Sequence, residues 1–136
     1  MSYNINRIID ANINRAKEGL RVAEEVTRFI LNNRVFTKEL KKLRHDLDAL
    51  AADFPESLKD LLKQRDSQED VGKDIYEGEL KRRNLQDIFF ANMQRVKEAI
   101  RVLEEFAKLK DAALAVKFKK IRYRLYVIEA TIGKRL

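Results

Sequence analysis

Asparagine, arginine and glutamate recur at one fixed spacing in two distant parts of this sequence. The stretch ANINRAKEGLRVAEE (11–25) aligns without a gap with ANMQRVKEAIRVLEE (91–105), and nine of the fifteen positions are identical. Most of these identical positions carry amide, guanidinium or carboxylate groups, which can hold phosphate oxygens, a divalent cation or the edge of a heterocycle. A repeat that served packing alone should keep its apolar positions instead. The repeat therefore indicates a polar site.

The helical period places some of these polar groups on the side that should face the core. At about 100° per residue, Asn12 and Arg15 fall within the apolar sector of a helix, and Glu18 lies at its edge. The counterparts in the second copy are Asn92, Arg95 and Glu98. An arginine facing a core is costly unless it is paired or faces a liganded cavity. Two explanations stay open: pairing with glutamates of the same helix, or one polar cavity to which both copies contribute.

A second pair of related segments follows the two copies. KKLRHDL (41–47) and KKIRYRL (119–125) place Arg44 and Arg122 beside apolar stripes, so they repeat the same anomaly. The Gly19 and Ala99 positions indicate close helix contacts rather than phosphate-binding loops, because no glycine-rich nucleotide motif is present.

The elements that position these groups are helices. Four glycines and one proline in 136 residues leave little material for turns, and apolar residues recur at helical spacing over about 4–32, 37–53 and 80–109. Asp111 can cap a last helix that ends at Gly133, and Pro55 suits the first turn of a short helix ending near Lys63. The segment 64–78 has no period and is predicted to be a loop.

These elements predict an all-α fold in one domain, residues 1–136. We expect a bundle of two duplicated antiparallel helix pairs, with four long helices and a short connecting helix. The two repeats cover about 4–53 and 80–133 and are joined by the short helix and loop at 54–79.

Composition excludes several classes of site and of protein. The chain has no cysteine and one histidine, so disulfides, thiolate metal sites and histidine clusters are ruled out. No run of 18 apolar residues is present, and the start MSYNINRIID lacks an apolar signal core, so we expect a cytoplasmic protein with no membrane contact. The net charge is +7, and residues 110–136 alone carry eight basic and two acidic groups, which favours anionic partners.

Five segments together resemble one known family. They are DANINRAKEGLRVAEEVTRF (10–29), LRHDL (43–47), RDSQEDVG (65–72), ANMQRVKEAIRVLEEFAKL (91–109) and KKIRYRLYVIEA (119–130). The family is the small helical hydroxymethylpyrimidine phosphate kinase, found in some bacteria ahead of thiamine phosphate synthase and also as a separate protein. The resemblance implies transfer of a phosphoryl group from ATP to the phosphate of that pyrimidine, with Mg²⁺. Since no synthase follows Leu136, the product would pass to a separate thiamine phosphate synthase. Glu69 stands where the family pattern leads us to expect glycine.

Chemistry suggests roles for the polar residues in such a reaction. Phosphoryl transfer needs mainly positioning and charge neutralisation, so the predicted phosphate clamps are Arg15, Arg95, Arg44 and Arg122. The candidate magnesium ligands are Glu18, Glu98 and Asp70. Asn12 and Asn92 suit the edge of an aminopyrimidine. Further candidates for substrate binding are Arg65, His45 and Tyr126, although a lone histidine beside an arginine commonly serves packing.

Two other functions remain open. A non-enzymatic basic helical module could bind RNA or a partner protein through residues 110–136, with steep salt dependence and no use of ATP. Few aromatic residues are available for base stacking, so nucleic acid is the less favoured partner. A scaffold whose repeat only forms a homodimer is the third possibility.

Overall fold

The computed structural model of the chain describes residues 5–54, 70, 72 and 80–136. Its long helices are α1 (Asn6–Glu25), α2 (Arg34–Ala52), α4 (Leu85–Ala107) and α5 (Ala112–Gly133). One turn of π-helix, η1 (Val26–Ile30), continues α1 before the chain turns into α2. The described residues contain no strand, which confirms the predicted all-α class. The predicted short helix from Pro55 and most of the predicted loop at 64–78 lie outside the described residues.

Polar side chains cap three helices at their N-terminal ends, where backbone N–H groups have no partner within the helix. Asn33 at the start of α2 and Asp111 at the start of α5 each accept a backbone hydrogen bond of 2.9 Å. Asn84 does the same for α4. The predicted cap at Asp111 and the predicted end at Gly133 are confirmed. α2 begins three residues earlier than predicted because Asn33 supplies its cap.

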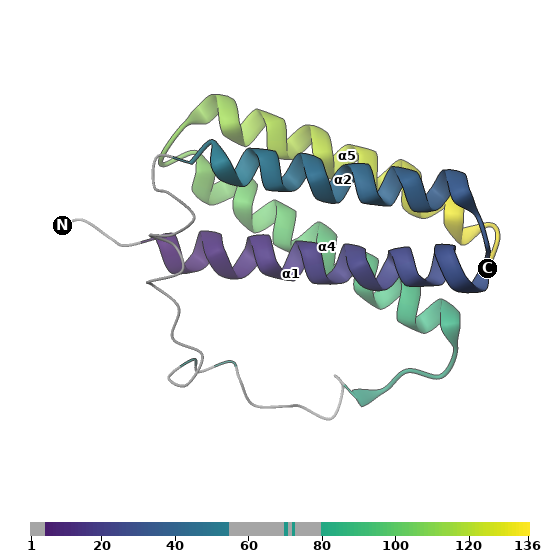
Figure 1. The fold of residues 1–136 in the computed structure, drawn as a ribbon. Coiled ribbons are helices and arrows are strands. Elements are labelled where there is room, and N and C mark those ends of the chain that lie inside the picture. The colour runs from purple at the N-terminus through teal and green to yellow at the C-terminus, as the bar shows by residue number, and fades with distance from the viewer. Residues whose placement is uncertain (1–4, 55–69, 71, 73–79) are drawn as a thin grey trace.

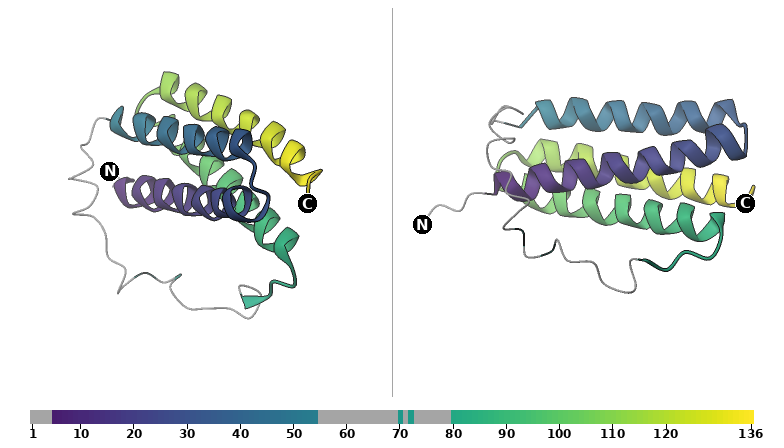
Figure 2. Two further views of the ribbon diagram at one scale, coloured as in Figure 1. Left: turned by 45° about the vertical axis from the view of Figure 1, so that its right-hand side comes forward. Right: turned by 60° about the horizontal axis from the view of Figure 1, so that its bottom comes forward.

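The helices form two antiparallel hairpins, α1 with α2 and α4 with α5, which assemble into a four-helix bundle (Figure 1). α1 and α4 share the most extensive contact, α2 packs on α1, and α5 packs on α4. Figure 2 shows that the helices run along a common direction, with α4 inclined to α1. The remaining seam, between α2 and α5, is the loosest of the four. No helix in the described part of the chain is long and apolar enough to cross a membrane.

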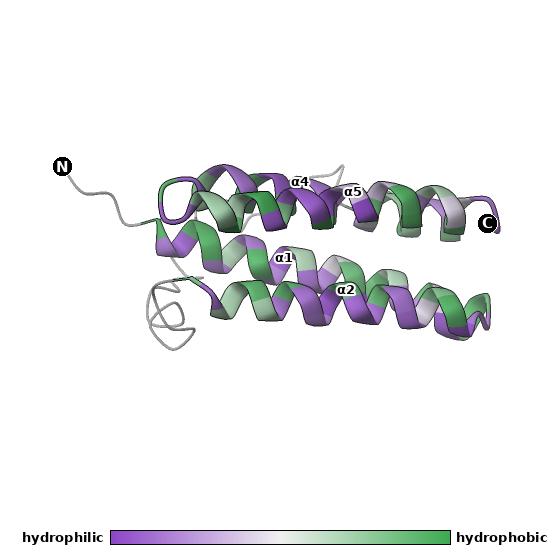
Figure 3. Cartoon of the chain, turned by 90° about the horizontal axis from the view of Figure 1, so that it is seen from above, coloured by the Kyte–Doolittle hydropathy of each residue, from purple (hydrophilic) through white to green (hydrophobic). Residues whose placement is uncertain are grey.

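One continuous core contains apolar side chains from all four helices. Leu40, Leu43 and Leu47 lie at helical spacing within the predicted helix 37–53, and all three are fully buried. Figure 3 shows hydrophobic and hydrophilic residues alternating along the helices. Ile30, an apolar residue near the end of the predicted helix 4–32, is instead 53% exposed. The π-turn holds an additional residue per turn and so rotates the side chains that follow α1.

Gly19 allows α1 and α4 to approach closely, as predicted. A Cβ atom at this position would lie 2.5 Å from Cγ2 of Val96 and 2.9 Å from the carbonyl oxygen of Asn92. Because one of these neighbours is backbone, the helices themselves would have to separate to admit a side chain.

We expect Gly19→Val to lower the free energy of unfolding by about 1–3 kcal/mol, the usual cost of overpacking a close contact. Urea unfolding monitored by circular dichroism measures this change. Ala130→Val on the exposed face of α5 is the matched control, since it adds the same β-branched side chain without a helix contact. Equal losses in the two variants would contradict the close-contact explanation.

Candidate functional site

Two buried glutamates, Glu24 and Glu104, occupy equivalent positions in the two copies of the repeat, and each binds an arginine of its own hairpin. Nε and Nη2 of Arg44 donate to the carboxylate of Glu24 at 2.7 and 3.3 Å. Arg122 binds Glu104 in the same way at 2.8 and 3.3 Å. The two carboxylate side chains are only 7% and 5% exposed. Each two-point pair therefore fastens the two helices of one hairpin away from bulk water.

The pairs shift the pKa values of Arg44, Glu104 and Arg122. The hydrogen bond with Glu24 raises the pKa of Arg44, against the opposing effect of burial. Burial raises the pKa of Glu104, but the hydrogen bond and charge of Arg122, with two further basic side chains, outweigh it and bring that pKa below its ordinary value. The hydrogen bond with Glu104 likewise raises the pKa of Arg122. Glu104 is therefore ionised at neutral pH.

A pocket of about 480 Å³ lies between α4 and α5 over the second pair, and we call it the hairpin pocket. Its lining residues are Gln94, Lys97, Glu98, Arg101, Val102, Arg122 and Tyr126. Arg101 contacts Glu104 and Glu105 at 3.1 and 2.9 Å, and Lys97 contacts Glu129 at 2.9 Å. Because the cations of the hairpin pocket are neutralised by carboxylates of the protein, this pocket is poorly suited to binding another anion.

A second pocket, of about 560 Å³, lies where α1 ends and α2 begins, and we call it the turn pocket. Its basic lining residues are Arg21, Arg28, Arg34, Lys38, Lys41 and Arg44. Its other lining residues are Glu24, Glu25, Asn32, Asn33 and Thr37. Six cations face two carboxylates, so the turn pocket has a surplus of four positive charges. Its volume is that of a small-molecule site.

Most cations of the turn pocket, unlike those of the hairpin pocket, form no ion pair with a described residue. Arg44 is the only one that forms an ion pair with a described residue. The guanidinium of Arg28 lies over the ring of Phe29, 4.7 Å from its centre. Arg21 is the repeat counterpart of Arg101, yet in the described part of the chain it has none of the carboxylate contacts that Arg101 makes. The two copies thus share one framework, but most cations of the turn pocket remain available to an anion, whereas those of the hairpin pocket are paired.

The backbone around the turn pocket is held in an unusual shape by side-chain hydrogen bonds. The amide of Leu31 donates to the carbonyl of Val26 across the π-turn at 3.0 Å, and Asn32 takes a left-handed conformation with φ of 49°. The hydroxyls of Thr27, which is fully buried, and Thr37 are 2.8 Å apart. π-turns and left-handed non-glycine residues are commonly found at functional sites. Here they place the first turns of α2 in the lining of the pocket, through Asn33, Arg34 and Thr37.

The repeated asparagines and the first pair of arginines do not line either of these pockets. Asn12 is buried as predicted, but its amide donates to the carbonyl of Ile8, and Asn92 repeats this bond within α4. Arg15 and Arg95 were predicted to face the core, and both are exposed. That prediction was wrong because α1 and α4 each pack against two neighbouring helices. The buried face of each helix is therefore centred on the residue next to the arginine, and the arginine itself lies outside it.

The described candidate residues do not meet in the single polar cavity that was expected to be shared by both copies. Arg44 and Arg122 line different pockets, because each pairs with a glutamate of its own hairpin. Tyr126 lines the hairpin pocket and accepts a hydrogen bond of 3.3 Å from Arg122. His45 is exposed on α2 and lines neither pocket. Arg65 lies outside the described residues.

The three carboxylates predicted to bind magnesium lie on separate parts of the structure. Glu18 is exposed on α1, Glu98 accepts a hydrogen bond from Gln94 in the hairpin pocket, and Asp70 accepts one from the amide of Gly72. The described residues contain no group of three acidic or histidine side chains able to hold a metal ion.

Sequence reasoning missed Glu24 with Glu104 and the free cations of the turn pocket. The signal for the glutamates was present: they are identical in both copies and follow the buried Ala23 and Leu103 directly. The signal for the pocket was a difference between the copies, since Arg34 and Lys38 correspond to Ala112 and Val116 in the second hairpin. Because the prediction relied on positions that are identical in both copies, it overlooked the positions that differ. The missed residues, conserved and unconserved together, are Glu24, Glu104, Arg21, Arg34, Lys38 and Lys41.

The fold and the turn pocket define a class of protein: a duplicated helical hairpin whose first copy carries a basic pocket of small-molecule size. Comparison with known families assigns the chain more narrowly. A model of the ThiD2 family matches residues 7–131, and the chain belongs to that family.

Several longer proteins with related sequences are named thiamine-phosphate synthase. The chain is 45% identical over 134 residues to the thiamine-phosphate synthase of Synechocystis sp., covering 97% of the chain and 37% of that protein. It is 40% identical over 126 residues to the thiamine-phosphate synthase of Rhodopirellula baltica, covering 92% of the chain and 33% of that protein. The chain thus spans about a third of the length of the curated relatives it matches. No solved structure matches the chain.

Proposed function

We propose that this protein acts in thiamine biosynthesis and transfers the γ-phosphoryl group of ATP to hydroxymethylpyrimidine phosphate, forming the pyrophosphate. The ThiD2 family and the thiamine-phosphate synthases that resemble the chain support the pathway. The four surplus positive charges of the turn pocket carry the proposal for phosphoryl transfer. A product pyrophosphate would be consumed by a thiamine phosphate synthase.

The turn pocket has the charge that two phosphorylated substrates require. Arg34 and Lys38 belong to the first two turns of α2, and Arg21 faces them from the end of α1. Their unpaired side chains can bind the oxygens of a donor triphosphate and of an acceptor phosphate, and Arg44, held by Glu24, adds a rigid cation at the base. Binding both anions in line is the main requirement of the reaction.

The chemical step needs no strong general base. An oxygen of the acceptor phosphate forms a bond to the γ-phosphorus of ATP, the bond from that phosphorus to the β–γ bridging oxygen breaks, and ADP leaves with the electron pair. The acceptor phosphate is already ionised near pH 7, since its second pKa is about 6. The residues of the turn pocket therefore act by neutralising charge and by holding the phosphates.

Magnesium would reach this site together with the phosphates of ATP. Mg²⁺ commonly keeps several waters and binds one or two carboxylates besides substrate phosphates, so it does not require a cage of protein ligands. Glu25 lines the turn pocket and forms no ion pair with a described residue, which makes it the candidate ligand there. When bound, the ion would neutralise charge that develops on the phosphate oxygens.

We expect the purified protein to release ADP when it is incubated with magnesium ATP and hydroxymethylpyrimidine phosphate. Phosphorus NMR should show new pyrophosphate resonances on the pyrimidine product. The unphosphorylated pyrimidine is the control, because it lacks the phosphate that accepts the transferred group. Absence of ADP, together with RNA binding that weakens steeply with salt, would contradict the kinase and favour the nucleic-acid module.

A further inference from the structure

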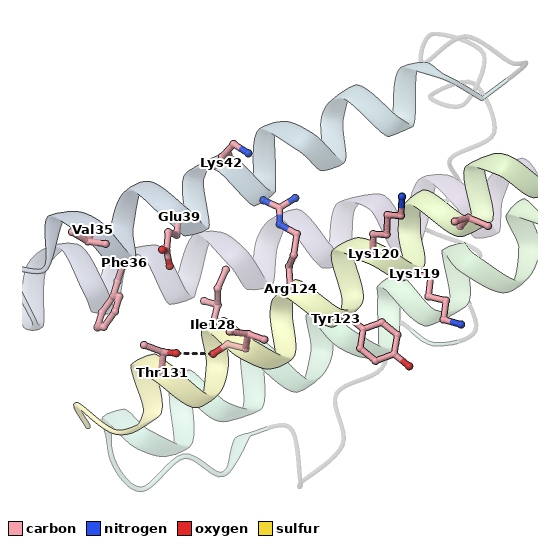
Figure 4. A pocket seen from close by; sticks show the side chains of 12 residues that line it. Val35, Phe36, Glu39, Lys42, Lys119, Lys120, Tyr123, Arg124, Ile128 and Thr131 are labelled. Carbon is pink, nitrogen blue, oxygen red and sulfur yellow. Dashed lines mark hydrogen bonds between the residues drawn. The ribbon is translucent and has the colours of Figure 1, made fainter.

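The loose seam between α2 and α5 forms an open groove of about 1050 Å³ (Figure 4). Val35 and Phe36 line it from α2, and Tyr123 and Ile128 line it from α5. None of the residues assigned to phosphate binding in the turn pocket lies in this α2–α5 groove. It is therefore a separate feature of the bundle.

α5 is apolar on two faces, which a helix covered only by its own bundle does not require. One face enters the core through Leu114, Phe118, Ile121 and Leu125. The other carries Val116, Tyr123 and Val127 into the groove, where they are 52%, 54% and 67% exposed. The spacings of seven and four residues keep these three side chains on one stripe. The groove lining on α5 runs from residue 116 to residue 131, about 22 Å at 1.5 Å per residue, so it fits an elongated occupant such as a helix.

The rim of the groove is basic. Lys119, Lys120, Arg124 and Lys42 line it against one acidic residue, Glu39. Arg124 and Lys42 share a single carboxylate, that of Asp46, at 2.8 and 3.8 Å. Lys120 forms no ion pair with a described residue. Figure 4 shows Lys119, Lys120 and Arg124 extending from α5 beside the apolar side chains.

We propose that the α2–α5 groove docks an amphipathic helix of a partner protein that presents aliphatic side chains flanked by glutamate or aspartate. Aliphatic side chains would cover the exposed Val116 and Val127, and flanking carboxylates would meet Lys120 and Arg124. A second copy of this chain does not fit in the same way. Joining two such faces about a twofold axis brings cations against cations, with Glu39 as the only acidic lining residue on each side.

A synthetic peptide of about 18 residues tests this docking mode. The probe is a helix with leucine at i, i+3, i+4 and i+7 and glutamate at the flanking positions. We expect it to bind with micromolar affinity and to shift the amide resonances of α2 and α5 in the isotope-labelled protein. A peptide with the same leucines and with lysine in place of glutamate should bind at least tenfold more weakly, because its charges match the rim.

Variants of exposed residues complete the test without disturbing the core. Val127→Asp and Lys120→Glu should each weaken binding of the glutamate peptide about tenfold or more. Leu109→Asp alters an apolar residue that is 72% exposed outside the groove, and binding should be unchanged. Equal affinity for the two peptides, or resonance shifts elsewhere, would overturn the proposal. So would a dimer in sedimentation that Val127→Asp dissociates, since a second copy would then be the occupant.

Discussion

The variant that combines Arg34→Gln with Lys38→Gln should lose kinase activity while keeping its fold. Both side chains line the turn pocket, are exposed and have no ion-pair partner among the described residues. A hydrogen bond to a charged group contributes roughly 1.5–3 kcal/mol. Loss of two such bonds should therefore lower kcat/KM by a factor of about 10² to 10⁴. The measurement is initial-rate formation of ADP at several substrate concentrations.

A variant with the same loss of charge elsewhere serves as the control for this experiment. Lys117→Gln combined with Lys134→Gln also removes two exposed cations, but from positions on and after α5 that line neither the turn pocket nor the groove. We expect it to keep full activity. Helical content and melting temperature should be unchanged in both double variants. Activity within about threefold of wild type in the Arg34 and Lys38 variant would remove the turn pocket from the mechanism.

The largest effect on stability is expected from Glu104→Gln. This change leaves Arg122, whose side chain is 15% exposed, without its anionic partner. Breaking a buried ion pair commonly costs about 3–5 kcal/mol. Since Gln can still accept a hydrogen bond and Arg122 reaches some solvent, we expect a loss of about 2–4 kcal/mol at pH 7. Urea unfolding measures it, and Glu105→Gln is the control because its carboxylate is exposed and its contacts are screened.

The stability difference between wild type and Glu104→Gln should depend on pH in a definite direction. The pKa of folded Glu104 lies below its ordinary value of 4.5, so the charged carboxylate stabilises the fold fully above that value. This contribution is lost as the pH falls through the lowered pKa. The stability difference between wild type and Glu104→Gln should therefore shrink at acidic pH. A constant difference, or equal effects of Glu104→Gln and Glu105→Gln, would argue against the buried pair.

The sequence predicted the architecture well because helix length and periodicity are local properties. The stripe of Leu40, Leu43 and Leu47, the cap at Asp111 and the end at Gly133 follow from residues close in sequence, and the structure confirms them. The direction of individual polar side chains was predicted less well. A helical projection assumes that each helix packs against one neighbour. Because α1 and α4 each pack against two, their buried faces differ from the predicted ones, and Arg15 and Arg95 face solvent.

The location of the candidate site could not be read from the period of the helices. The turn pocket depends on the π-turn, the left-handed Asn32 and the hydroxyl contact between Thr27 and Thr37, all of which join two helices through space. Which cations remain unpaired could not be read from the repeat either. Arg21 and Arg101 are each followed by glutamates three and four residues later, and among the described residues only Arg101 forms ion pairs with them.

The π-turn also lies where the two halves of the chain differ in length. The two copies are offset by 80 residues at the first motif and by 78 at the KKLR and KKIR segments, so the first connection is two residues longer. The wide turn of η1 and the bend at Asn32 accommodate this added length. Duplicated hairpins with equal connections would form a symmetric pair with two like sites. Here the longer first connection lines the turn pocket, so the two halves differ in the ligand site that they can form.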